Sequence, residues 1–221
     1  TTEIWEFGAG SGALALQLLS ALEQLGQPVT RYTIVDLSGS LRQRQQETLA
    51  VFGDKVRWAS ELPDAMQGVV VGNEVLDAMP AKLLARVKGT WYERGVIVKS
   101  DCASEHEFDW QDRPTELRPP LEIMGGHDYV TEIHPQAEAF MRTLAHKLTS
   151  SERGGAAFFI DYGFPEAEYF HPQRNMGTVM CHQGHQADGD PQDQVGRKDI
   201  TAHVNFTGVA VAAQDEGLNT L

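Results

Sequence analysis

A glycine-rich segment, EFGAGSGA at residues 6–13, constrains the fold of this chain more than any other feature. An apolar run precedes it, and the amphipathic stretch LALQLLSALEQL follows it directly. Gly8, Gly10 and Gly12 permit positive φ angles and lack the Cβ atoms that would hold a ligand away from the backbone. A helix that begins at such a turn presents unpaired N–H groups and a positive dipole end. The segment therefore predicts a strand, a turn and a helix, with a nucleotide-like ligand at the turn.

The first part of the chain continues this alternation of strands and helices. The run GVVVG is apolar throughout, as is typical of a central parallel strand that is buried on both faces. Alternating strands and helices predict a doubly wound, mostly parallel α/β sheet. We expect strands at residues 2–7, 31–36, 55–58 and 68–72, and helices at residues 13–25 and 38–52.

The pattern changes after Pro80. Two strands, residues 82–88 and 91–99, are expected on either side of a short Gly-Thr turn, and EHEFDW at residues 105–110 alternates like a third. We predict an antiparallel β-rich insertion at residues 82–126 of a single domain that spans residues 1–221. Further along, we expect helices at 135–148 and 207–216, strands at 156–161 and 178–181, extended chain at 199–206, and loops at 111–126, 163–173 and 184–196.

Composition excludes several classes of partner. Lys and Arg total 18 against 31 Asp and Glu, which gives a net charge of −13 and argues against binding to nucleic acid or anionic membranes. No apolar run reaches the ~20 residues that cross a bilayer, so we expect no membrane insertion. Cys102 and Cys181 form no disulfide framework, and the His and Asp residues between positions 171 and 203 lack the spacing of a zinc motif. We expect no metal site.

The glycine turn fits two classes of cofactor. Gly8, Gly10 and Ala13 match GxGxxG/A, the dinucleotide fingerprint, whereas Glu6 with the three glycines matches ExGxGxG, which is common in S-adenosylmethionine-dependent methyltransferases. Both classes place an acidic residue at the end of the second strand to accept hydrogen bonds from ribose hydroxyls. Asp36 stands at that position, so it supports nucleoside binding but does not choose between the two cofactors.

Polar residues follow two later strands. The segment GNEVLDAMP begins where the GVVVG strand ends, and the carboxyl ends of parallel strands converge on one crevice. Asn73 could fix a donor amine or the amino-acid end of the cofactor, and Glu74 and Asp77 could bind a cationic substrate. Asp161 and Tyr162 end a further strand and could line the acceptor pocket. The alternative is a turn whose Asn and Asp side chains bond only to the local backbone.

These motifs together resemble a known family. EFGAGSGALA, VDLSGSLRQRQQETL, GNEVLDAMP, VTEIHPQAEAF, FFIDYG and GRKDITAHVNFTGVA, in this order, are similar to the MidA-like methyltransferases, whose mitochondrial members assist respiratory complex I assembly. The resemblance implies a class I (Rossmann-like) methyltransferase fold, S-adenosylmethionine as cofactor and protein arginine methylation. That family has a further region before the glycine turn, so we expect this chain to be a fragment. In the family the second strand often ends in Glu, where this chain has Asp36.

Arginine as acceptor gives the carboxylates a role. A guanidinium stays protonated, with a pKa above ~12, so carboxylates must orient it toward the methyl donor. Glu74 is the first candidate for the carboxylate that holds the guanidinium, and Asp77 is the second. We expect a protein substrate that bears an accessible Arg, and no metal or covalent intermediate. The expected compartment is the cytoplasm in a bacterium and the mitochondrial matrix in a eukaryote. The alternatives are a non-catalytic assembly factor that retains a nucleoside-binding fold and a nicotinamide-dependent oxidoreductase.

Overall fold

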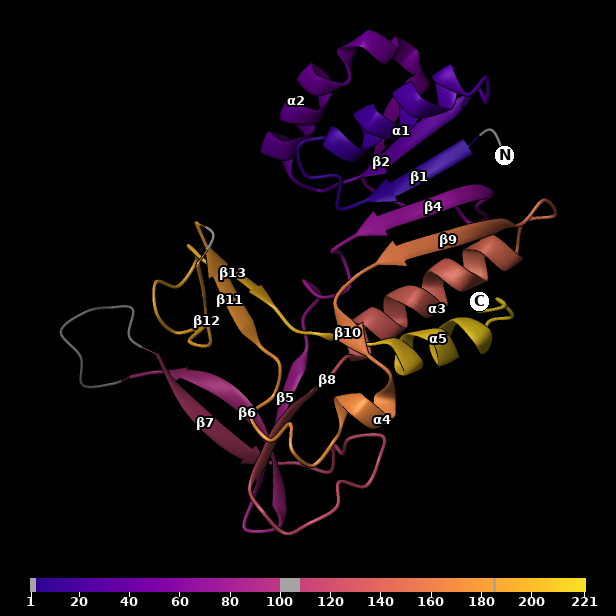
Figure 1. Cartoon of the computed structure of the whole chain (residues 1–221). Coiled ribbons are helices and arrows are strands. Elements are labelled where there is room, and N and C mark those ends of the chain that lie inside the picture. The colour runs from indigo at the N-terminus through magenta and orange to yellow at the C-terminus, as the bar shows by residue number, and fades with distance from the viewer. Residues whose placement is uncertain (1–2, 100–107, 185) are drawn as a thin grey trace. The chain divides into compact units, whose positions relative to one another are not determined.

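The computed structural model describes residues 3–99, 108–184 and 186–221 (Figure 1). The chain divides into two compact units, which are described separately below. The first comprises the residues up to Val75 together with Met141–Asp161 and Ala213–Leu221. The second comprises Leu76–Phe140 and Tyr162–Ala212.

A five-stranded parallel sheet forms the centre of the first unit, in the order β3-β2-β1-β4-β9 (Figure 1). Trp5, at the middle of β1, lies opposite Thr33 on one neighbouring strand and Val70 on the other. Strand order therefore reverses between β1 and β4, which creates a topological switch point. The strands are β1 (Glu3–Phe7), β2 (Arg31–Val35), β3 (Val56–Ala59), β4 (Gly68–Asn73) and β9 (Gly155–Ile160), as the apolar runs predict.

Two helices of the N-terminal part pack on this sheet. Helix α1 (Ala13–Gln24) places Ala15 and Leu19 in one hydrophobic core with Ile34 of β2 and with Leu49. Helix α2 (Gly39–Thr48) begins after Ser38, whose Oγ accepts a hydrogen bond from the N–H of Leu41 at 3.4 Å. A Ser in this position satisfies one of the unpaired N–H groups at a helix start. The short η1 (Ala50–Lys55) then leads into β3.

Two further helices run from the second unit into the first. Helix α3 (Pro135–Thr149) buries Leu144 and Leu148, and the carbonyl of Lys147 accepts a hydrogen bond from the N–H of Met66 at 2.8 Å. Helix α5 (Phe206–Gln214) is the last element. Both lie where the sequence predicts helices. No helix of the described residues is long and apolar enough to span a bilayer.

The second unit contains a four-stranded antiparallel sheet in the order β7-β6-β5-β8, which confirms the predicted antiparallel insertion. Its strands are β5 (Lys82–Val87), β6 (Thr90–Val98), β7 (Phe108–Pro114) and β8 (Tyr129–Ile133). The sequence gives no prediction of β8. The loop expected from residue 111 is wrong at its start, because β7 continues to Pro114. Residues 105–107, where the sequence predicts the start of that strand, lie outside the described residues.

Smaller elements complete the second unit. Three short strands pair in the order β12-β11-β13, and β10 pairs with β14. The prediction of a loop at residues 163–173 is wrong, because the chain there forms β10 and α4. The loop predicted from residue 184 contains the short strand β12. The bounds are β10 (Gly163–Phe164), α4 (Glu166–Tyr169), β11 (Met180–Gln183), β12 (Gln186–Asp188), β13 (Asp199–Thr201) and β14 (Val204–Asn205).

Candidate functional site

The glycine turn follows β1 at the switch point of the first unit. Gly8, Gly10 and Gly12 have φ angles of 65°, 52° and 83°, which other residues adopt only with strain. A Cβ on Gly8 would lie 2.8 Å from Cγ2 of Val75, so the turn packs closely against the loop after β4. A Cβ on Gly10 would meet no described atom within 4 Å. The backbone at Gly10 therefore faces open space, as binding of a ligand to the backbone requires.

The start of α1 adds hydrogen-bond donors to this space. Gly12 occupies the N-cap position of the helix, and no side-chain hydrogen bond caps the helix start among the described residues. Its N–H donates to the carbonyl of Ala9 at 2.8 Å, which closes the turn. The first turn of α1 carries no acidic side chain that would compete for its N–H groups. A polar or anionic group of a ligand would be stabilised here.

Asp36 follows β2 and is held at both carboxylate oxygens. Oδ1 accepts a hydrogen bond from the N–H of Ser38 at 2.8 Å, and Oδ2 accepts one from Nε2 of Gln45 at 2.8 Å. Sequence reasoning missed Gln45. Its signal was the spacing of Leu41, Gln45 and Leu49, which places a glutamine within the apolar stripe of α2.

Glu6 lies inside the sheet layer. It is 1% exposed, and its Oε2 accepts a hydrogen bond from the hydroxyl of Tyr32 at 2.9 Å. Burial raises the pKa of Glu6 to about 7, although the Tyr32 bond acts in the opposite direction. Burial and the neighbouring carboxylate also raise the pKa of Tyr32. In this position Glu6, near the end of β1, is linked to Tyr32, near the start of β2. Its contact with a cofactor stays a prediction.

The loop after β4 brings three of the predicted residues together. Asn73 and Glu74 are exposed, and the N–H of Glu74 donates to the carbonyl of Ile160 at 2.8 Å. Oδ2 of Asp161 accepts from the N–H of Val75 at 3.2 Å, so the ends of β4 and β9 are tied together. Glu74 has a φ of 52°, a left-handed conformation that costs about 1–2 kcal/mol for a non-glycine residue.

The other two predicted residues belong to the second unit. Tyr162 is 63% exposed, and its carbonyl accepts a hydrogen bond from the N–H of Val204 at 2.8 Å. Asp77 is buried, and its carbonyl accepts from the N–H of Ala202 at 2.9 Å. Asp77 also lines a cavity of about 560 Å³ whose walls are mainly apolar, with Trp110 and Val179 among them.

A second polar cluster in this unit centres on Glu132 of β8, from the VTEIHP motif. Glu132 is 0% exposed, and its carboxylate accepts hydrogen bonds from the hydroxyl of Tyr169 at 2.9 Å and from the N–H groups of Thr178 at 2.8 Å and Val179 at 3.2 Å. The same hydroxyl lies 2.9 Å from Nε2 of His134, whose pKa is lowered by burial. The network joins β8, α4 and the chain that leads into β11, and therefore stabilises this part of the unit.

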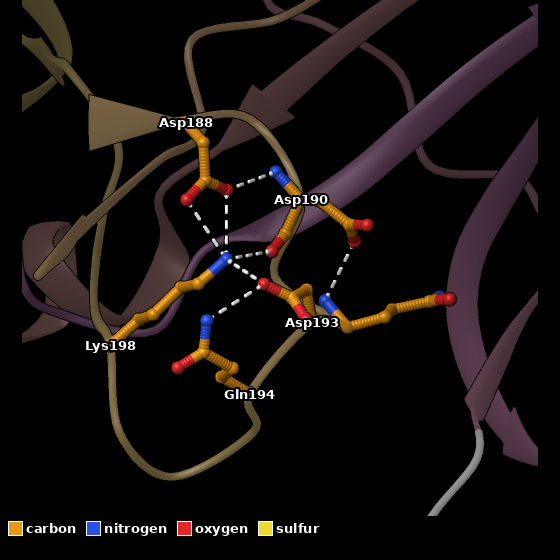
Figure 2. A network of polar contacts seen from close by, with 6 residues as sticks. Asp188, Asp190, Asp193, Gln194 and Lys198 are labelled. Atoms are coloured by element: carbon orange, nitrogen blue, oxygen red, sulfur yellow. Dashed lines mark hydrogen bonds and ion pairs between the residues drawn. The ribbon is translucent and has the colours of Figure 1, made fainter. Parts of the chain in front are cut away.

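The acidic loop from residue 188 to residue 198 surrounds a lysine (Figure 2). Nζ of Lys198 lies 2.9 Å from a carboxylate oxygen of Asp188 and 2.9 Å from one of Asp193. The backbone carbonyl of Asp190 accepts from the same ammonium at 3.3 Å. The side chain of Lys198 is 5% exposed, and its hydrogen bonds to the two aspartates raise its pKa. The aspartates of this loop thus bind a cation that belongs to the chain itself.

The comparisons with known proteins decide the family. A family described as "Putative S-adenosyl-L-methionine-dependent methyltransferase" matches residues 1–221. This chain belongs to that family. This match confirms the family expected from the sequence, and together with the crystal structures below it confirms the expected fold class and the S-adenosylmethionine cofactor.

Two crystal structures of COG1565 superfamily proteins from Burkholderia thailandensis are similar to this chain over most of its length. One, which is bound to S-adenosyl-homocysteine, has a TM-score of 0.89 and 48% identity and covers 98% of this chain and 56% of its own. The other, a native structure, has a TM-score of 0.87 and 47% identity and covers 98% and 58%.

A curated relative is the "Protein arginine methyltransferase NDUFAF7 homolog, mitochondrial" of Caenorhabditis elegans. It is 22% identical over 237 residues, which cover 96% of this chain and 53% of the relative. This chain thus spans about half the length of the relatives that it matches.

Proposed function

We propose that this protein transfers a methyl group from S-adenosylmethionine to an arginine side chain of a partner protein. Membership of the methyltransferase family supports the reaction, and the name of the Caenorhabditis elegans relative supports arginine as the acceptor. The observation that carries the proposal is the position of Glu74. Its exposed carboxylate follows a central strand directly beside the switch point, on a backbone conformation that a glycine would adopt at lower cost.

The residues around the glycine turn fit the cofactor. Gly10 offers backbone that a ligand can approach, and the uncapped start of α1 offers donors for the carboxylate of its amino-acid end. Asp36 retains acceptor capacity for the ribose hydroxyls, because an ionised carboxylate has about four lone-pair sites and two hydrogen bonds occupy it here. When bound, the cofactor supplies an electrophilic methyl group on a sulfonium.

Glu74 would hold the substrate guanidinium through charge-assisted hydrogen bonds. Such a clamp localises the positive charge and leaves one nitrogen free to face the methyl group. Glu74 would also accept the proton that the methylated nitrogen releases. Asn73, the residue before Glu74, can orient the amino-acid end of the cofactor through its amide.

Asp77 and the cavity that it lines support an arginine substrate. The mainly apolar walls of the cavity suit the aliphatic stem of an arginine, and a carboxylate suits its head. We propose Asp77 as the second carboxylate for the acceptor, and Asp161 and Tyr162 as residues that line the acceptor pocket. A role in complex I assembly and a mitochondrial compartment stay predictions from the family resemblance.

Two measurements test the proposal. Calorimetric titration with S-adenosylhomocysteine should show binding that Gly10→Val and Asp36→Ala both weaken; unchanged affinity in both variants would contradict the cofactor site. Glu74→Gln should then retain this affinity but lose transfer of labelled methyl groups to an arginine-containing protein. Glu47→Gln, which alters an exposed carboxylate of α2, is the matched control.

The outcome also separates the alternatives. Normal cofactor binding by the full-length protein, without methyl transfer to any protein of a cell extract, would favour the non-catalytic assembly factor. Full activity of Glu74→Gln would remove Glu74 from its proposed role. Binding of NADH in place of S-adenosylhomocysteine would favour the oxidoreductase.

A further inference from the structure

Gln45 is a fully buried polar residue on α2, with 0% of its surface exposed. Its Nε2 donates hydrogen bonds to Oδ2 of Asp36 at 2.8 Å and to the carbonyl of Gly10 at 3.0 Å. Its Oε1 accepts a hydrogen bond from Nε1 of Trp58 at 2.9 Å. Because the indole can only donate and the other two partners can only accept, one orientation of the amide satisfies all three.

We propose that Gln45 is a positioning residue that fixes the two nucleoside-binding loops of this site to each other before the ligand arrives. The Gly10 carbonyl belongs to the turn after β1, and the Asp36 carboxylate belongs to the loop after β2. One amide nitrogen bonds to both. Gln45 therefore sets the distance between the backbone that faces the ligand and the carboxylate that accepts its ribose hydroxyls.

The bonds also fix orientation within each loop. In a trans peptide the carbonyl and the following N–H point in opposite directions. Since the Gly10 carbonyl faces Gln45, the N–H of Ser11 points away from α2. The carboxylate of Asp36 is held at Oδ2 by Gln45 and at Oδ1 by the N–H of Ser38, so its rotamer is set without a ligand. Preorganisation of this kind raises affinity because less freedom is lost on binding.

Trp58 completes the arrangement from β3. Its indole N–H satisfies the amide oxygen of Gln45, so burial of this polar side chain leaves neither end of the amide without a partner. The guanidinium of Arg42 lies 5.9 Å from the centre of the Trp58 ring. The turn after β1, the loop after β2 and strand β3 thus all bond to a single amide on α2, and a change at this position alters both loops together.

The inference rests on the proposed function, because it assumes that the nucleoside binds between Gly10 and Asp36. The test is calorimetric titration with S-adenosylhomocysteine on the full-length protein and four variants. Gln45→Met keeps the length of the side chain and removes its donors. It should weaken binding about tenfold, the lower end of what loss of an outer partner costs at metal sites. Gln46→Met alters the next, exposed residue of α2 and should leave affinity unchanged.

Asp36→Ala and the double variant Asp36→Ala/Gln45→Met distinguish positioning from general stabilisation. If Gln45 acts through Asp36, the double variant should bind nearly as well as Asp36→Ala alone, since the effects of coupled residues do not add. Fully additive losses would overturn the proposal. Absence of binding by the unaltered protein would instead refute the cofactor site, and is therefore a distinguishable failure.

Gln45→Glu provides a second route if Gln45→Met folds poorly or Asp36→Ala leaves no measurable binding. This variant keeps an oxygen for Trp58 but places a carboxylate against Asp36, and like charges at this distance repel. Its affinity for S-adenosylhomocysteine, relative to that of the unaltered protein, should be lower at about pH 8 than at about pH 6, where the introduced group regains a proton. A relative affinity that is the same at both pH values would contradict the role of Gln45.

Discussion

Replacement of Glu6 by glutamine should make the stability of the protein less dependent on pH. Burial raises the pKa of Glu6 from its ordinary 4.5 to about 7, so the folded state keeps a proton that the unfolded state has already lost. A raised pKa on an acid means that stability is greatest below the ordinary value and falls as pH rises to about 7. Each pH unit across this interval changes stability by about 1.4 kcal/mol. The ionised carboxylate therefore lowers the free energy of unfolding by about 3 kcal/mol above pH 7.

Glu6→Gln removes this titration but keeps an oxygen that can accept the hydrogen bond from Tyr32. Any cost of burying the new NH₂ group is the same at every pH, so the informative quantity is the slope of the free energy of unfolding against pH. Urea unfolding of both proteins from about pH 5.5 to about pH 8.5 should show that the unaltered protein loses about 2 kcal/mol relative to the variant.

Two results would refute this reasoning. A difference between the proteins that stays constant with pH would show that Glu6 does not titrate in this range. A difference of opposite slope would show that Glu6 is stabilised as a carboxylate. Tyr32→Phe is the complementary variant, because it removes the hydrogen bond that favours the ionised form. Its loss of stability should extend to higher pH.

Three further predictions concern backbone and buried polar groups. Gly10→Ala should lower stability by about 1 kcal/mol, the cost of a side chain at positive φ. Gly8→Ala should lower it more, because its Cβ would lie 2.8 Å from the side chain of Val75. Equal melting temperatures of the two variants would contradict this order. Glu132→Ala should cost about 3 kcal/mol in urea unfolding, since it removes the acceptor of the buried Tyr169 hydroxyl and of the part-buried N–H groups of Thr178 and Val179. A loss below about 1 kcal/mol would show that water replaces the carboxylate. Gly177→Ala should be comparably destabilising in thermal unfolding, because a Cβ there would collide with the Glu132 carboxylate, and a wild-type melting temperature would show that the carboxylate can move aside.

The sequence predicted the parallel sheet well because local signals, such as the apolar run of β4, mark its strands. The apolar composition of β4 and of the segment before the glycine turn indicates strands, and Ser38 marks the start of α2 as an N-cap. The positive φ angles of Gly8, Gly10 and Gly12 also agree with the conformational freedom expected of them. In each of these places a local physical cause determines the structure.

Prediction failed where distant partners decide the structure. Strand β8 buries Glu132, and a charged residue in the core is stable only because Tyr169 and two backbone N–H groups from later in the chain bond to it. The burial of Gln45 likewise depends on partners at positions 10, 36 and 58. Spacing places Gln45 in the apolar stripe of α2, but it does not show which groups satisfy a buried amide or a buried carboxylate, because these partners come from other strands and loops.

Candidate site residues fall into the same two classes. The positions of Asp36 and Glu74 at strand ends were predictable, because strand ends in a parallel sheet converge on one edge, and their binding roles stay predictions. The buried environment of Glu6 was not, since an acidic residue before a glycine turn reads equally well as a ligand contact. Its partner Tyr32 comes from the neighbouring strand β2.

Lys198 gives its loop a property that a metal-binding loop lacks. A bound ion leaves when it is diluted or chelated, whereas an ammonium attached to the chain is always present at a high effective concentration. The side chains of Asp188 and Asp193 are 48% and 54% exposed, so dissolved salt screens these ion pairs without displacing the ammonium. The order of this loop is therefore set by covalent connection rather than by a dissociation constant, and removal of divalent ions from the solution leaves its counter-ion in place.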